Sequence, residues 1–183
     1  EELETRINDE LIANFANFIY RVLSFLYENF DGTVPEVDEL SNEDRKIVKK
    51  ANDVANECKA LIEAFQLRKG LEKAIEVAIT GNRYFTHQKP WNTVDSEPET
   101  CARTLYVTVN LCKILGVLVE PYLPFTAENI WQQLNMRASV HETDWASGTE
   151  CTIESGHQIN EPTLLFEKVN KEDLQRKLAK IRE

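Results

Sequence analysis

The sequence predicts an all-α fold: a bundle of about five helices, then an irregular segment and a short terminal helix. Apolar residues recur at steps of three and four over most of the first 136 residues, which is the period of helices that bury one face. Only 6 of the 183 residues are Gly and 6 are Pro, the two residue types least compatible with helix interiors. From residue 137 to 162 the period disappears and Gly, Ser and Thr become frequent. We therefore expect a helical bundle over 1–136, an irregular segment that packs back on it over 137–169, and a terminal helix or the start of a linker over 170–183.

The first predicted helix carries an apolar stripe that starts at Leu3 and ends before a turn at residues 31–32. Beside that stripe, Asn14, Asn17 and Arg21 fall at spacings of three and four and share one face of the helix. Asparagine is a poor helix former because its amide competes for backbone hydrogen bonds. Two asparagines in mid-helix suggest a use for these amides in binding, although an ordinary solvated face has the same polarity.

Two antiparallel helices follow. Ser41 and Asp44 have the spacing of a capping box, which predicts the start of the second helix. Its apolar stripe extends to Phe65, and the break at residues 66–70 is so short that the third helix must run back along it. The third helix leads into the stretch 81–91.

The stretch 81–91 interleaves aromatic rings with cations at a helix exit. Pro90 has no backbone N–H and disfavours a helical conformation of Lys89. We therefore expect the helix to end before Pro90 and Lys89 to be extended. Trp91 should then lie on a fixed backbone. Rings beside cations can stack an unpaired base and attract its phosphates; alternatively, Trp91 closes the helical core. The rings are Tyr84, Phe85 and Trp91, and the cations are Arg83, His87 and Lys89.

A central helix is predicted next. We expect a turn at 93–97 and a second capping box from Ser96 and Glu99. Residues 105–119 are apolar almost all round, which is typical of a helix wrapped by others, and too few to span a membrane. A short helix from Phe125 to Leu134 follows two prolines, and the apolar residues 164–166 could anchor the irregular segment.

The overall charge restricts the kind of partner. With 31 acidic and 21 basic residues the net charge is −10, which works against non-specific binding to a polyanion. Any contact with nucleic acid must therefore be local. The four cysteines lack C-x-x-C spacing, and no signal peptide is evident, so we expect reduced cysteines, no metal site and a cytoplasmic protein. Because the chain opens without Met, we expect a fragment of a longer polypeptide.

No set of catalytic residues can be assembled. The three histidines are scattered, and neither metalloprotease, serine-nucleophile nor phosphate-loop motifs occur. The carboxylates lie mostly on helix faces that should be solvated, whereas acid and base catalysts need perturbing environments. Binding is therefore favoured over reaction, with no catalytic residue.

Four stretches together resemble the anticodon-binding domain of methionyl-tRNA synthetases. They are NFANFIYR at 14–21, Asn82-x-Tyr84 followed by Pro90-Trp91, and EPYLPFTAENIW at 120–131. Residues 156–168 are similar to a later segment of the archaeal and eukaryotic members. The proline-rich stretch is shared with other class I synthetases, whereas the asparagine–arginine stripe combined with Pro-Trp is more specific.

The resemblance implies a class I synthetase anticodon-binding bundle that reads the CAU anticodon of methionine tRNAs. Trp91 would stack on anticodon bases and Pro90 would hold it, while Asn17 and Arg21 would recognise the first anticodon base. Asn14 is given a supporting role on the same stripe. Accessory RNA contacts are expected from Arg83, His87 and Lys89.

The resemblance also implies an enzyme from which this chain is one part, a methionine-tRNA ligase that supports aminoacylation in protein synthesis. The nucleotide- and methionine-binding motifs of that family are absent here, so the chain alone should be inactive. No cofactor is expected within it; ATP, with zinc as a further candidate, would belong to the catalytic part. The expected partners are the anticodon loop of methionine tRNA and that catalytic domain, and neither a membrane nor DNA.

Two alternatives stay open at this point. One is the anticodon domain of a leucine, isoleucine or valine enzyme, which shares the signature near residue 124. The other is a helical protein-interaction module in which Trp91 and Trp131 belong to the core and the acidic faces bind a basic protein.

Overall fold

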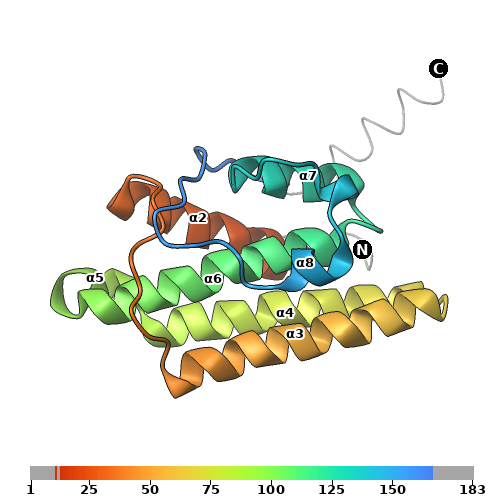
Figure 1. Ribbon diagram of the computed structural model, residues 1–183, viewed down its shortest axis with the longest axis horizontal. Coiled ribbons are helices and arrows are strands. Elements are labelled where there is room, and N and C mark those ends of the chain that lie inside the picture. Colours follow the sequence, from red (N-terminus) through yellow and green to blue (C-terminus); the bar gives the residue numbers. More distant parts are fainter. Residues whose placement is uncertain (1–10, 12, 167–183) are drawn as a thin grey trace, which may run out of the picture.

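The computed structural model describes residue 11 and residues 13–166, and these residues confirm the all-α prediction (Figure 1). Five longer helices make up the bundle, and two short helices and one 3-10 turn lie between or after them. A π-helical turn at 13–16 precedes the first of these helices. The elements are α2 (Asn17–Phe30), α3 (Asn42–Glu63), α4 (Leu67–Gln88), α5 (Pro90–Ser96), α6 (Pro98–Val119), α7 (Pro124–Gln133), η2 (Val140–Glu142) and α8 (Trp145–Thr149).

Helix α6 is the centre of the molecule, as its all-round apolar character predicted. It contacts each of the other six α-helices, and Figure 1 shows it between α2 on one side and the α3–α4 hairpin on the other. By length and composition α6 could cross a membrane, but 89% of its most apolar 18-residue window is buried inside the protein. That burial is the pattern of a core helix.

The α3–α4 hairpin is fixed to α6 through one buried carboxylate. The predicted capping box is confirmed: Asp44 accepts a hydrogen bond from the Ser41 N–H at 2.8 Å. The same carboxylate accepts from the Tyr84 hydroxyl at 2.5 Å and lies 3.3 Å from Arg103 Nε. Burial, and then the bond to Asp44, raise the pKa of Tyr84, so its hydroxyl keeps its proton. One side chain thus joins the start of α3 to the end of α4 and to α6.

The segment after α7 returns to the bundle through two polar residues of α6. The Asn110 side chain accepts from the Ile153 N–H at 3.0 Å and donates to the Ile153 carbonyl at 3.1 Å. The Lys113 ammonium donates to the carbonyls of Ser147 and Glu150, at 2.9 and 3.0 Å. Burial lowers the pKa of Lys113. The two polar residues inside the apolar helix therefore anchor the later segment.

All four cysteines are unpaired, as expected for reduced core residues. Cys58, Cys101 and Cys112 are buried and Cys151 is half-buried. Burial raises the pKa of Cys58, Cys101 and Cys151 to about 11. The thiols are therefore protonated and unreactive at neutral pH.

Three local expectations about residues 89–99 are wrong. Lys89 is left-handed, with φ 48° and ψ 60°, and is not extended, because a second helix begins directly at Pro90 and the chain must reverse within one residue. The expected turn at 93–97 is mostly helical, since α5 continues to Ser96. Ser96 caps nothing: its hydroxyl donates to the carbonyl of Asn92, and Glu97 precedes α6.

The ends of the described region differ in part from expectation. Phe125 is 90% exposed at the start of α7, whereas Trp131 and Leu134 further along are buried. The anchor at 164–166 is made by Leu165 and Phe166, since Leu164 is 65% exposed. The expected irregular segment contains η2 and α8. The start of the first apolar stripe and the expected helix at 170–183 lie outside the described residues, and the three-part division of the chain stays a prediction.

Candidate nucleic-acid interface

A shallow pocket lies between the start of α2 and the last turns of α4. We call it the amide pocket; its volume is about 500 Å³. None of its lining residues in the described part of the chain is acidic. It is lined by Ala13, Asn14, Asn17, Arg21, Asn82, Arg83, Thr86 and His87.

Close helix approach makes this pocket possible. Gly81 faces the ring of Phe18 on α2, and a methyl group at position 81 would overlap that ring. The absence of a side chain lets α4 approach α2 closely, so that side chains of both helices line one pocket. Residues that lie more than sixty positions apart in the sequence thereby become neighbours.

Arg21 contacts an amide and two aromatic rings beside the pocket. Its Nη1 donates to the Asn82 side-chain oxygen at 3.3 Å. Its guanidinium carbon lies 5.4 Å from the centre of the Phe85 ring and 6.0 Å from that of Trp91, distances at which cation–π attraction operates. A guanidinium has five N–H donors, so most of this fork remains available to a ligand.

Trp91 stands beside Arg21 and is 44% exposed. Its indole meets the Phe85 ring edge to face, with centroids 6.1 Å apart, and Phe85 makes a similar contact with Phe25 at 6.1 Å. Pro90 is buried at the first position of α5, which fixes the backbone that carries the indole. The exposed part of the ring is therefore a rigid flat surface.

The asparagines differ in how tightly they are held. The Asn82 amide donates to the backbone carbonyl of Asn14 at 2.7 Å while its oxygen accepts from Arg21. Asn82 thus connects the π-helical turn before α2 with the cation on α2. Asn17 is exposed at the first position of α2, and its amide is accessible to a ligand.

The structure brings together most of the side chains that the sequence singled out. Asn14, Asn17 and Arg21 line one pocket with two of the expected accessory residues, Arg83 and His87. His87 Nδ1 also lies 3.6 Å from Glu43. Lys89 is exposed at the end of α4 but does not line the pocket. The roles assigned to these residues stay predictions.

Two of the three rings in the stretch 81–91 are not accessible. Tyr84 and Phe85 are 3% and 2% exposed, so only Trp91 of the three offers a ring surface to a ligand. Phe85 instead forms the floor on which Arg21 and Trp91 rest. Two polar pocket residues, Asn82 and Thr86, were not predicted to bind a ligand; their spacing of four on α4 is the signal that could have found them.

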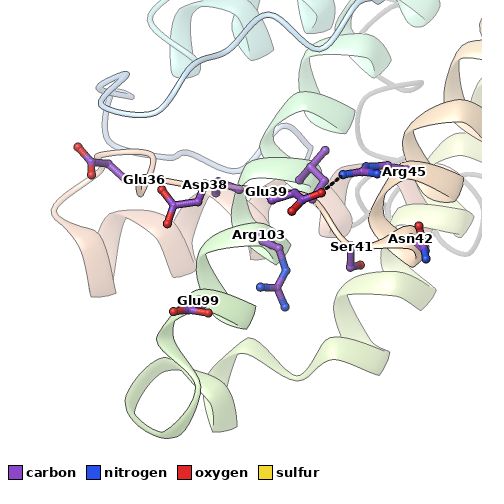
Figure 2. A pocket seen from close by; sticks show the side chains of 10 residues that line it. Glu36, Asp38, Glu39, Ser41, Asn42, Arg45, Glu99 and Arg103 are labelled. Carbon is purple, nitrogen blue, oxygen red and sulfur yellow. Dashed lines mark hydrogen bonds and ion pairs between the residues drawn. The ribbon is translucent and has the colours of Figure 1, made fainter.

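A second pocket, between the 36–41 loop and the starts of α3 and α6, has the opposite character (Figure 2). We call it the acidic pocket; its volume is also about 500 Å³. Its two arginines are already ion-paired: Arg45 with Glu39 at 2.6 Å, and Arg103 with the buried Asp44 at 3.3 Å. It is lined by Glu36, Val37, Asp38, Glu39, Leu40, Ser41, Asn42, Arg45, Glu99 and Arg103.

Comparisons with known proteins agree in sequence and in structure. Residues 34–182 match the family described as the anticodon binding domain of methionyl tRNA ligase. The methionine–tRNA ligase of Methanopyrus kandleri is 38% identical over 97% of this chain and 26% of its own length. That of Thermococcus onnurineus is 39% identical over 94% of this chain and 23% of its own length.

A solved structure shows the same fold. The free-state crystal structure of methionyl-tRNA synthetase from Mycobacterium tuberculosis superposes with a TM-score of 0.82 at 28% sequence identity. The match covers 91% of this chain and 34% of that protein. The chain thus spans about a quarter of the length of the two relatives and about a third of that structure.

Proposed function

This chain belongs to the family of anticodon-binding domains of methionyl-tRNA ligases, and from that premise we propose that it recognises the CAU anticodon of methionine tRNAs. The family assignment removes the leucine, isoleucine and valine alternatives. It also favours RNA over a basic protein as the partner, because an RNA base suits both the hydrogen-bonding groups of the amide pocket and the exposed indole.

The observation that carries the proposal is the position of the Arg21 guanidinium. Asn82 holds it by a hydrogen bond, Phe85 lies beneath it, and the half-exposed indole of Trp91 is 6.0 Å away. A base stacked on that indole would present its edge to the guanidinium and to the amide of Asn17. Stacking and edge recognition are thereby available at one point.

The chemistry of that edge suits cytosine. The Watson–Crick edge of cytosine carries two acceptors, its O2 and N3, beside an amino donor. The guanidinium fork can donate to the acceptors, and the Asn17 side-chain oxygen can accept from the amino group. Uracil has a donor at N3, which would face the guanidinium donors and leave a desolvated group unpaired. Arg21 and Asn17 would therefore select cytosine at the first anticodon position.

Stacking supplies affinity without choosing among bases. A base that stacks on an aromatic side chain contributes about 1–3 kcal/mol. Pro90 would hold Trp91 for this role, Asn14 would support the stripe, and Arg83, His87 and Lys89 would give further contacts around the pocket. With a net charge of −10, the rest of the surface would keep the RNA from binding elsewhere.

The activity of the whole enzyme is a proposal about the larger protein. We infer that the chain acts in a cytoplasmic methionine–tRNA ligase whose catalytic part activates methionine with ATP, with zinc as a further candidate there. This chain would contribute recognition of the tRNA only. We expect this chain by itself to have no aminoacylation activity.

Binding of anticodon stem-loops tests the proposal. Stem-loops carrying CAU, UAU and CAA are titrated in parallel at a low and a high salt concentration. We expect CAU to bind most tightly and its advantage over UAU to persist at high salt, because base-edge recognition does not depend on counterion release. Asn17→Ala should reduce that advantage, and Asn56→Ala, which removes an exposed asparagine of α3, should not. Equal affinity for the three loops at both salt concentrations would contradict the proposal.

A further inference from the structure

The outer edges of α3 and α4 are joined by a series of polar side-chain pairs. The two helices run antiparallel, and two carboxylate–lysine pairs and one carboxylate–histidine contact cross between them. Nearest the amide pocket, Glu43 lies 3.6 Å from His87. Further along the hairpin, Lys50 pairs with Glu76 at 3.5 Å and Glu57 with Lys73 at 2.9 Å.

One position in this series has two cations. Lys46 lies three residues after Glu43 and four before Lys50, so it falls in the same row of α3. Arg83 lies four residues before His87 and seven after Glu76, in the facing row of α4. The helical period therefore places Lys46 opposite Arg83, between the first pair and the second.

Neither cation has a partner among residue 11 and residues 13–166. Both side chains are exposed, and neither makes a hydrogen bond or an ion pair with any residue in the ranges that the structure describes. Their neighbours differ: Lys49 is paired with Asp53 at 2.7 Å, and Lys50 with Glu76. Two facing cations repel each other weakly in the free protein, and a bound anion would remove that repulsion.

The place of this pair indicates which anion. Arg83 lines the amide pocket, and the helical period places Lys46 next to Arg83 on the α3 side. We propose that Lys46 and Arg83 together bind one backbone phosphate of the RNA whose base occupies the amide pocket. The inference rests on the proposed function and adds to it a phosphate site and a residue of α3.

A shared phosphate has a definite signature in binding measurements. Phosphate contacts position the RNA and do not read its sequence. Removing one phosphate contact to a single strand makes the slope of log K against log salt less steep by about 0.7, which corresponds to about fivefold weaker binding near 0.1 M salt. Because both cations would meet the same phosphate, the effects of the two substitutions should not multiply.

The experiment is a salt titration of CAU and UAU stem-loop binding to the full chain and its variants. We expect Lys46→Gln and Arg83→Gln each to weaken binding of both loops up to about fivefold, and the double variant to lose no more than one phosphate contact. The preference for CAU over UAU should stay unchanged in Lys46→Gln. Lys59→Gln, an exposed lysine on the same helix with no partner in the described ranges, is the matched control and should bind as the unmodified chain does.

Lys46→Glu separates a binding effect from a folding effect. This change gives Arg83 an opposite charge to pair with, so the melting temperature should stay equal or rise, while RNA binding falls further than in Lys46→Gln. The inference is overturned if the unmodified chain prefers CAU but Lys46→Gln has the same stem-loop affinity and salt dependence as Lys59→Gln. Equal binding of CAU and UAU by the unmodified chain contradicts the proposed function instead, and a chain that binds neither loop overturns both.

Discussion

The amide pocket and the acidic pocket are equal in volume and differ in what their cations are bound to. In the amide pocket Arg21 touches an amide and two rings, and Arg83 has no partner in the described part of the chain. In the acidic pocket Arg45 is ion-paired with Glu39 (Figure 2), and Arg103 is ion-paired with the buried Asp44. A count of arginines would not separate the two sites, because each has two.

The group that a cation contacts within the protein therefore decides whether the cation stabilises the fold or remains available to a ligand. A guanidinium neutralised by a carboxylate holds the protein together, as Arg103 does between α3 and α6 through Asp44. A guanidinium supported by an amide and by aromatic faces keeps its charge and most of its donors for a ligand. An acidic domain can therefore present one local RNA site.

Removal of the Asp44 carboxylate should damage the fold and leave RNA recognition intact. Asp44→Ala leaves the Tyr84 hydroxyl and the Arg103 guanidinium without their shared partner, and we expect the free energy of unfolding to fall by about 3 kcal/mol. Urea denaturation measures that loss, and at a temperature where the variant is folded its affinity for the CAU loop should change less than about twofold. Asp53→Ala, which removes an exposed carboxylate of α3, is the control and should cost less than about 0.5 kcal/mol. A stable Asp44→Ala variant that has lost CAU binding would show that Asp44 serves RNA binding and does not stabilise the fold.

Removal of the Trp91 ring should have the converse effect. Trp91→Ala deletes the accessible stacking surface, and we expect CAU affinity to fall by about 1–3 kcal/mol, which is about 5- to 150-fold. The free energy of unfolding should fall by only about 1 kcal/mol, because the side chain is 44% exposed. Phe125→Ala removes another exposed ring, at the start of α7, and should leave RNA affinity unchanged. If both variants bind the loop equally well, the indole does not stack on RNA.

Replacement of Arg21 by lysine should reduce selectivity more than affinity. The ammonium keeps the charge but not the planar fork, so the ratio of CAU to UAU affinity should shrink by about 1–2 kcal/mol. The ratio is measured by fluorescence anisotropy with the two loops. Arg68→Lys, at an exposed arginine of α4, is the matched change and should leave the ratio unaltered. An undiminished preference in Arg21→Lys would show that another residue reads the first base.

Neutralisation of the acidic pocket should have the smallest effect. Glu36→Gln and Glu99→Gln each remove one exposed negative charge, and we expect the affinity for any stem-loop to rise less than about twofold at low salt and to be unchanged at high salt. The salt dependence of binding measures this change. A large gain for the CAU loop alone would mean that the RNA contacts the acidic pocket.

The sequence predicted the helices and one side of the site because both depend on local spacing. The period of 3.6 places Asn14, Asn17 and Arg21 on one face without knowledge of any other helix. The contact of Arg21 with Asn82 depends on tertiary packing, since the two lie 61 positions apart. Only the family resemblance connected the first helix with Pro90 and Trp91.

The errors near residues 84–97 have physical causes of the same kind. The residues 74, 78, 81 and 85 follow the buried period of α4, a spacing that could have shown Phe85 to be internal. Tyr84 falls on the same buried face, but its hydrogen bond to Asp44 of α3 depends on tertiary packing, which no local pattern reveals. The left-handed conformation of Lys89 follows from the start of α5 at the next residue, and a single proline does not predict that short helix.

The indole N–H signals of Trp91, Trp131 and Trp145 offer the most direct test of the account. A titration of the ¹⁵N-labelled chain with the CAU stem-loop follows all three at once, and Trp91→Phe assigns the first. We predict a large shift of the Trp91 signal and none of the Trp131 signal, whose side chain is 2% exposed, together with shifts of the Asn17 and Asn82 side-chain amides. An unmoved Trp91 signal, or shifts centred on residues 36–42 and 99–103, would contradict recognition at the amide pocket.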